Sequence, residues 1–162
     1  MPVTDVTRNL DARSLVVTAE FAAPIERVWE VYADPRQLER IWGPPTHPAT
    51  VVDHSLTPGG KVHYYMTSPE GEKFYGGWRV LTVQPPREFT FEDFFADAGF
   101  APAEGLPVAH CVFAFEPEGD HTRATFTTTY ATVEALQQVL DMGMEEGATQ
   151  AMNQIDALLA RG

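Results

Sequence analysis

Residues that could do chemistry occur in this sequence, but their spacing does not assemble a known catalytic or metal site. Cys111 follows His110, and neighbouring strand residues point to opposite faces, so that histidine is poorly placed to activate the thiol. No G-x-S-x-G motif or phosphate-binding glycine loop occurs. We therefore expect no metal and no cofactor, and any catalytic residues are unknown. The histidines fall in different predicted strands or loops, without H-x-x-x-H or H-x-E spacing: His47, His54, His63, His110 and His121.

The remaining candidates for acid–base chemistry are two tyrosines, Tyr64 and Tyr130, and the neighbours Asp53 and His54. Because Asp53 and His54 are adjacent on a predicted strand, one of them must point inward. An ionisable group that faces an apolar cavity would have a shifted pKa and could transfer a proton. Exposure to solvent at the strand end is the alternative, and the sequence leaves both readings open.

The composition fits a single domain that can bury a sizeable core, because the chain has 162 residues and 44% of them are hydrophobic. The 11 basic and 23 acidic residues give a net charge of −12. This charge repels nucleic-acid phosphates and anionic lipid, so we expect neither nucleic acid nor a membrane as partner. The single cysteine, Cys111, excludes an intrachain disulfide and is compatible with the cytoplasm, where we expect the protein. A homodimer linked through this thiol stays open.

The first part of the chain predicts an N-terminal extension, 1–13, followed by one domain, 14–162. Alternation of apolar and polar residues over 14–21 indicates a strand. Two short helices follow, the first beginning behind Pro24 and the second behind Asp34.

The remainder predicts strands and then a helix. Segments rich in β-branched and aromatic residues between about 48 and 130 indicate six further strands, and their short turn-rich connectors favour antiparallel pairing. Beyond Thr132, apolar residues at steps of three or four predict a long amphipathic helix that Gly143 could interrupt. We expect an α+β fold, in which a curved antiparallel sheet of seven strands wraps around this helix.

The same alternation predicts which side chains point into the concave face of that sheet. The predicted helix adds glycines, alanines and methionines, which leave space or form flexible walls. A packed core is the alternative reading of both patterns. The residues that we expect to line a cavity are Trp42, Tyr64, Met66, Phe74, Trp78, Phe89, Phe91, Phe113, Phe115, Phe126, Tyr130, Met144, Gly147, Ala148, Ala151 and Met152.

Several stretches, in this order, resemble the SRPBCC (START/Bet v-like) superfamily, in the branch named after the C-terminal domain of the activator of heat-shock-protein-90 ATPase. They are FAAPIERVWEVYADPRQLERIWGPP, LTPGGKV, GWRVLTVQPPREF, the aromatic strand before HTRATFT, and MGMEEGATQAMNQIDALL. The resemblance covers roughly residues 14 to 160. It implies a helix-grip fold with a cavity between sheet and C-terminal helix, and therefore small hydrophobic ligands.

Three functions are consistent with these observations. The first is binding of a small hydrophobic molecule without defined catalysis. The second is a cofactor-free enzyme of the cyclase or hydratase kind known in the superfamily, which would need at least two polar groups converging in the cavity. The third is an interaction with a chaperone like that of the ATPase activator, although the N-terminal domain of that activator has no counterpart in this sequence.

Overall fold

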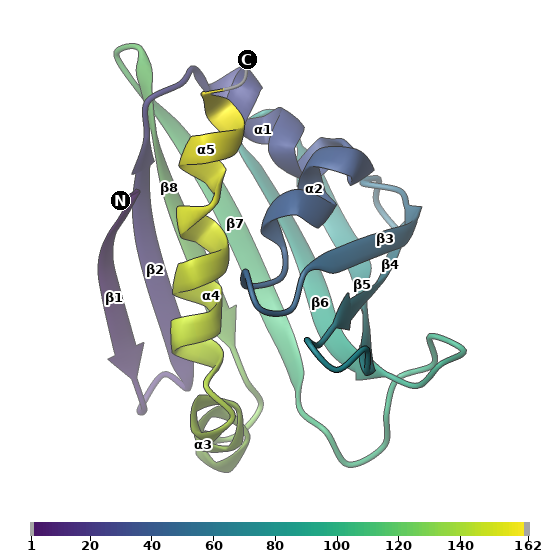
Figure 1. The fold of residues 1–162 in the computed structure, drawn as a ribbon. Coiled ribbons are helices and arrows are strands. Elements are labelled where there is room, and N and C mark those ends of the chain that lie inside the picture. Colours follow the sequence, from purple (N-terminus) through teal and green to yellow (C-terminus); the bar gives the residue numbers. More distant parts are fainter. Residues whose placement is uncertain (1, 161–162) are drawn as a thin grey trace.

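The protein is built on one antiparallel sheet, curved around a layer of helices (Figure 1). The computed structural model describes residues 2–160. Its strands lie in the order β1-β2-β8-β7-β6-β5-β4-β3, and each neighbouring pair is antiparallel. Their bounds are β1 (Val3–Asn9), β2 (Ser14–Phe21), β3 (Ala49–His54), β4 (Lys61–Thr67), β5 (Lys73–Gln84), β6 (Glu88–Ala96), β7 (Val108–Glu118) and β8 (His121–Thr129).

The predicted number of strands, seven, was wrong, because the sheet has 8. The additional strand is β1, which lies in the segment that we expected to be an extension before the domain. It forms an edge of the sheet and pairs with β2, for example Val6 with Val17. Its sequence, VTDVTRN, is mostly exposed, and only Val3 and Val6 are partly buried. An edge strand that buries so little shows little apolar alternation, which is why the sequence pattern missed it.

Two short helices, α1 (Ile25–Ala33) and α2 (Pro35–Ile41), cover part of the concave face, as Figure 1 shows. The Asp34 side chain caps α2 by accepting a hydrogen bond from the Arg36 backbone N–H at 2.9 Å, and Pro35 occupies the first turn, as predicted. Tyr32 on α1 is buried, and its ring lies 5.7 Å from that of Phe89 on β6. These helices therefore seal the part of the sheet beneath them.

The C-terminal helix is present, but it is divided into α3 (Val133–Asp141), α4 (Met144–Asn153) and α5 (Ile155–Leu159). Thr132 caps α3 by accepting from the Ala135 N–H at 3.0 Å. The chain then turns at Gly143, whose φ of 87° lies in the left-handed region that favours glycine. Figure 1 shows α3 nearly end-on while α4 runs along the sheet. Among residues 2–160, no helix is long and apolar enough to cross a membrane.

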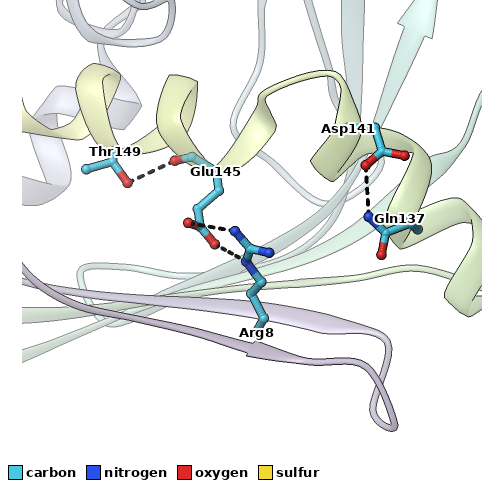
Figure 2. A network of polar contacts seen from close by, with 5 residues as sticks. All are labelled: Arg8, Gln137, Asp141, Glu145 and Thr149. Atoms are coloured by element: carbon cyan, nitrogen blue, oxygen red, sulfur yellow. Dashed lines mark hydrogen bonds and ion pairs between the residues drawn. The ribbon is translucent and has the colours of Figure 1, made fainter.

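The missed strand β1 also holds α4 in place. The guanidinium of Arg8 on β1 donates two hydrogen bonds to the Glu145 carboxylate on α4, at 2.6 and 3.3 Å (Figure 2). The first turn of α4 is reinforced where the Thr149 hydroxyl donates to the Glu145 carbonyl at 2.9 Å. At the other end of α4, the Asn153 amide oxygen accepts from the Val3 N–H at 3.3 Å. The edge strand thus fixes the position of α4 along the sheet.

We predict that two glycines of the α4 region respond in opposite directions to alanine. Gly143→Ala should lower the free energy of unfolding by about 1 kcal/mol, because alanine is strained at positive φ. Gly147→Ala should raise it by about 0.5–1 kcal/mol, because an added Cβ meets nothing within 4 Å and alanine favours the helix interior. Urea titrations measure both values. A change in the same direction for both variants would contradict the described turn.

Candidate functional site

A pocket of about 640 Å³ lies between the concave face of the sheet and helices α3 and α4. Strands β4, β6, β7 and β8 contribute its floor, and Trp42 together with the loop after α2 contributes one side. Helices α3 and α4 form the opposite side. The exposed side chain of Met142 lies in the lining, between α3 and α4. The volume falls in the range of small-molecule sites.

The structure brings together most of the residues that the sequence placed around a cavity. Those that line the pocket are Trp42, Tyr64, Met66, Phe113, Tyr130, Met144, Gly147, Ala148, Ala151 and Met152. They come from five separate parts of the chain, namely the end of α2, strands β4 and β7, the end of β8, and α4. The rings of Trp42 and Tyr64 lie 5.9 Å apart, edge to face.

The other predicted residues, Phe74, Trp78, Phe89, Phe91, Phe115 and Phe126, are not in the pocket lining. Trp78, Phe89 and Phe91 point inward but are fully buried, because Trp42 and α1 cover them; the rings of Trp42 and Trp78 are 4.8 Å apart. Phe115 and Phe126 lie under Tyr32 in the same way. Phe74 is 49% exposed at the start of β5, near His47. Alternation predicts the face of a strand correctly, but not which part of that face a helix covers.

The pocket remains open because Gly147, Ala148 and Ala151, in the part of α4 that borders it, carry little side-chain volume. A Cβ built on Gly147 would meet no atom within 4 Å. Ala148 and Ala151 follow on the same lining, flanked by Met144 and Met152. Close packing of α4 against the sheet would have placed atoms next to Gly147. The small residues therefore border empty space.

A hydrogen-bonded pair of side chains stands on the sheet side of the pocket. The Tyr64 hydroxyl on β4 donates to Asp93 Oδ1 on β6 at 2.9 Å. The intervening strand β5 carries Gly76 beneath the tyrosine, and a Cβ at that position would collide with the Tyr64 ring. Gly76 thus lets the tyrosine reach across β5 to the aspartate.

The surroundings of Asp93 are apolar and shift its ionisation. Burial raises the Asp93 pKa from 3.8 to about 7, and the Tyr64 hydrogen bond opposes part of that shift. Burial, followed by the nearby Asp93 carboxylate, also raises the pKa of Tyr64, Tyr130 and the Cys111 thiol. At neutral pH these three groups are uncharged, and Asp93 is the one among the four that can gain or lose a proton.

The other acid–base candidates lie outside the pocket. The imidazole of His54 contacts the carbonyl oxygen of Tyr32 through Nε2 at 2.9 Å. Asp53 is largely exposed, and its Oδ2 lies 2.8 Å from His63 Nδ1. His54 pairs with the buried Val62 and faces the concave side toward α1, whereas Asp53 pairs with His63 and points away. The β-bulge of β3 between Val51 and Asp53 sets this parity. Within residues 2–160, no three His, Cys, Asp or Glu side chains are grouped so as to hold a metal ion.

The sequence reasoning missed Asp93, although the necessary signal was there. Phe89 and Phe91 were placed inward by alternation, and the next residue of that parity is Asp93. Only the aromatic residues of this strand were considered as lining candidates, so its acid was overlooked. Tyr32 and Thr128 also line the pocket without having been predicted there.

We predict that Asp93→Asn changes how stability depends on pH. The folded-state pKa of about 7 exceeds the ordinary 3.8, so protonation of Asp93 stabilises the fold. This stabilisation is complete below about pH 4 and is lost as the pH rises to about 7. The unfolding free energy of the wild type, relative to Asp93→Asn, should fall by roughly 2 kcal/mol over that window and then stay level. This is less than the full pKa shift implies, because pocket water screens the charge. Urea titrations at several pH values test it, and a pH-independent difference would contradict it.

Comparisons with known proteins place the chain in a family. The profile of the family described as "Activator of Hsp90 ATPase homolog 1-like protein" matches residues 22–160. The crystal structure of protein Ms6760 from Mycobacterium smegmatis is 59% identical, with a TM-score of 0.91 over 98% of this chain and 97% of that one. A solution structure of a protein from Arthrobacter aurescens is 45% identical, with a TM-score of 0.95 over 99% and 93%.

A more distant solution structure, of a protein from Staphylococcus epidermidis, is 28% identical and has a TM-score of 0.84 over 98% of this chain and 94% of that one. No protein of curated function matches the chain. The family profile spans most of the chain, and the matched structures are covered almost end to end. The chain therefore belongs to the Activator of Hsp90 ATPase homolog 1-like family, within the SRPBCC superfamily that its motifs indicated.

Proposed function

We propose that this protein binds a small hydrophobic molecule in the pocket between the sheet and α4. The observation that carries the proposal is the empty volume against Gly147, because a helix packed for stability alone would fill it. Aromatic side chains supply the opposite wall, and Met144 and Met152 supply flexible surfaces that adapt to a ligand.

The proposal also concerns where the protein acts and on what. A net charge of −12 disfavours nucleic acid and anionic lipid as partners, because both bind to positively charged surfaces. A small hydrophobic molecule does not need a positively charged surface. We propose the cytoplasm as its location, with which the free and buried Cys111 thiol is compatible. The bound molecule would be held by apolar contact over most of its surface and oriented by the Tyr64–Asp93 pair.

That pair favours a second candidate function, proton transfer to or from a bound substrate. A carboxyl group whose pKa is about 7 can act as acid or base at neutral pH. If it does, the protein should catalyse deuterium exchange next to the carbonyl of an apolar ketone such as phenylbutanone, and Asp93→Asn should abolish the catalysis. Equal exchange rates with and without the protein would exclude this chemistry for such ketones and leave binding alone.

We predict that filling the empty volume blocks binding without harming the fold. The neutral fluorophore N-phenyl-naphthylamine should bind the wild type with increased emission and should alter the tryptophan emission, because Trp42 lines the pocket. Gly147→Leu should weaken binding by at least about tenfold, since the added methylenes occupy ligand space. Gly147→Ala serves as the matched control and should bind nearly as well as the wild type.

Thermal unfolding of the same variants separates a pocket from a packed core. If the volume is empty, Gly147→Leu should unfold cooperatively at or above the temperature of the wild type. If α4 is packed there, the leucine should destabilise the fold by roughly 1–3 kcal/mol. That loss of stability, together with the absence of fluorophore binding to the wild type, would refute the proposed function.

A further inference from the structure

The charges that line the pocket have one sign. Asp93 lies on the sheet side and Glu146 on the α4 side, and no lysine or arginine is among the lining residues. Among the described residues of that lining, His47 is the one with a basic side chain. The whole chain carries a net charge of −12, which adds to the negative potential. A ligand with a carboxylate or phosphate would meet like charge and find no lysine or arginine to pair with it.

Asp93 has hydrogen-bonding capacity that the protein does not fill. Within residues 2–160, the Tyr64 hydroxyl is the hydrogen-bond partner of its carboxylate, through Oδ1. An ionised carboxylate accepts at both oxygens, at up to about four positions. No ion pair with a described lysine, arginine or histidine neutralises it, although the carboxylates of Asp53, Glu92 and Glu145 all have such a partner. Because Asp93 lines the pocket, a donor on a ligand can reach it.

Aromatic rings surround the same part of the pocket. Trp42 lies edge to face with Tyr64 at 5.9 Å, and its ring is 6.3 Å from that of Phe113. Tyr130 lines the pocket close enough to Asp93 for the carboxylate to raise its pKa. The negative faces of aromatic rings attract cations, with tryptophan the strongest. A carboxylate beside such rings is a chemical environment suited to an ammonium group.

We propose that the ligand is an amphipathic amine, whose ammonium group binds Asp93 among these rings while its apolar body lies against Phe113 and the small-residue face of α4. This inference rests on the proposed function and adds to it the chemical class of the ligand. The same lining disfavours fatty acids and other apolar anions, because it offers them no lysine or arginine.

The pH dependence of binding follows from the groups around Asp93. An ammonium ligand prefers the ionised carboxylate, whose pKa is about 7 in the unliganded protein, so binding should release a proton below that pH. Tyr64, Tyr130 and Cys111 stay neutral because their pKa values are raised. The titratable and charged groups that share the pocket with Asp93 are Tyr64 from β4, Cys111 from β7, Tyr130 after β8, His47 after α2 and Glu146 from α4.

The experiment compares three probes that share one apolar body, namely phenylbutylamine, phenylbutanol and phenylbutanoate, by calorimetric titration or displacement of N-phenyl-naphthylamine. The amine should bind at least about tenfold more tightly than the alcohol, and the carboxylate more weakly than either. Asp93→Asn should reduce the amine to the affinity of the alcohol and leave the alcohol unchanged. Amine affinity in the wild type should fall toward that of the alcohol between about pH 7.5 and about pH 5.5, by roughly sevenfold where the preference at pH 7.5 is tenfold, and should stay constant in Asp93→Asn.

Matched variants separate this site from general charge effects. Asp53→Asn removes the same charge from an exposed position outside the pocket and should preserve the preference for the amine. His47→Gln removes the neighbouring imidazole and should preserve the pH dependence. The pH dependence of amine binding to the wild type tests the same carboxylate without any substitution, which keeps the inference testable if Asp93→Asn fails to fold.

The outcomes distinguish a failure of the amine inference from a failure of the proposed hydrophobic binding. If the carboxylate binds as tightly as the amine, or if the amine preference survives in Asp93→Asn, the amine inference is overturned while hydrophobic binding stands. Equal binding of amine and alcohol to the wild type has the same consequence. If none of the three probes nor the fluorophore binds, the proposed function fails together with the inference.

Discussion

The concave face of the sheet carries more apolar surface than the helices cover. The first pair of helices, α1 and α2, closes one part of that face through Tyr32 and Trp42, beneath which large aromatic side chains are fully buried. The remaining part lies under α4, whose glycine and alanines contribute little volume. The packed aromatic core and the cavity therefore occupy different parts of the same face of the sheet. Such an arrangement permits an empty pocket, since most of the large aromatic side chains are fully buried outside its lining.

Asp93, at the edge of this empty space, lowers the stability of the fold. A carboxyl group in an apolar setting loses hydration, and its pKa rises until the proton is held near neutral pH. The chain provides one hydroxyl donor to Asp93 and makes room for it with Gly76, but supplies no basic partner among the described residues. A purely structural role would be met by an apolar residue at this position. An acid that interacts with a ligand accounts for both the carboxyl group and its incomplete solvation.

Much of the architecture could be predicted from local patterns, because it depends on them. Asp34 and Pro35 specify the start of α2, Thr132 specifies the start of α3, and Gly143 marks the turn into α4. Period-two alternation identified the inward faces of the strands. It failed for β1, which buries too little to leave a pattern, and it could not decide which of Asp53 and His54 faces inward, because a bulge sets the parity there. The extent of the pocket depends on where α1 and α4 lie on the sheet. This tertiary property separates the partly buried Trp42, which lines the pocket, from the fully buried Trp78, although their rings are only 4.8 Å apart.

The central claim is that apolar ligands enter the space between the sheet and α4. Nuclear magnetic resonance of protein labelled at methionine methyl and tryptophan indole groups, titrated with phenylbutanol, tests it most directly. Binding in this space should cause saturable shifts at Met66, Met144 and Met152 and at the indole of Trp42, with smaller ones at Trp78 and Trp29, which are outside the lining. The absence of shifts, or shifts at Trp29 without any at Trp42 and Met144, would contradict it.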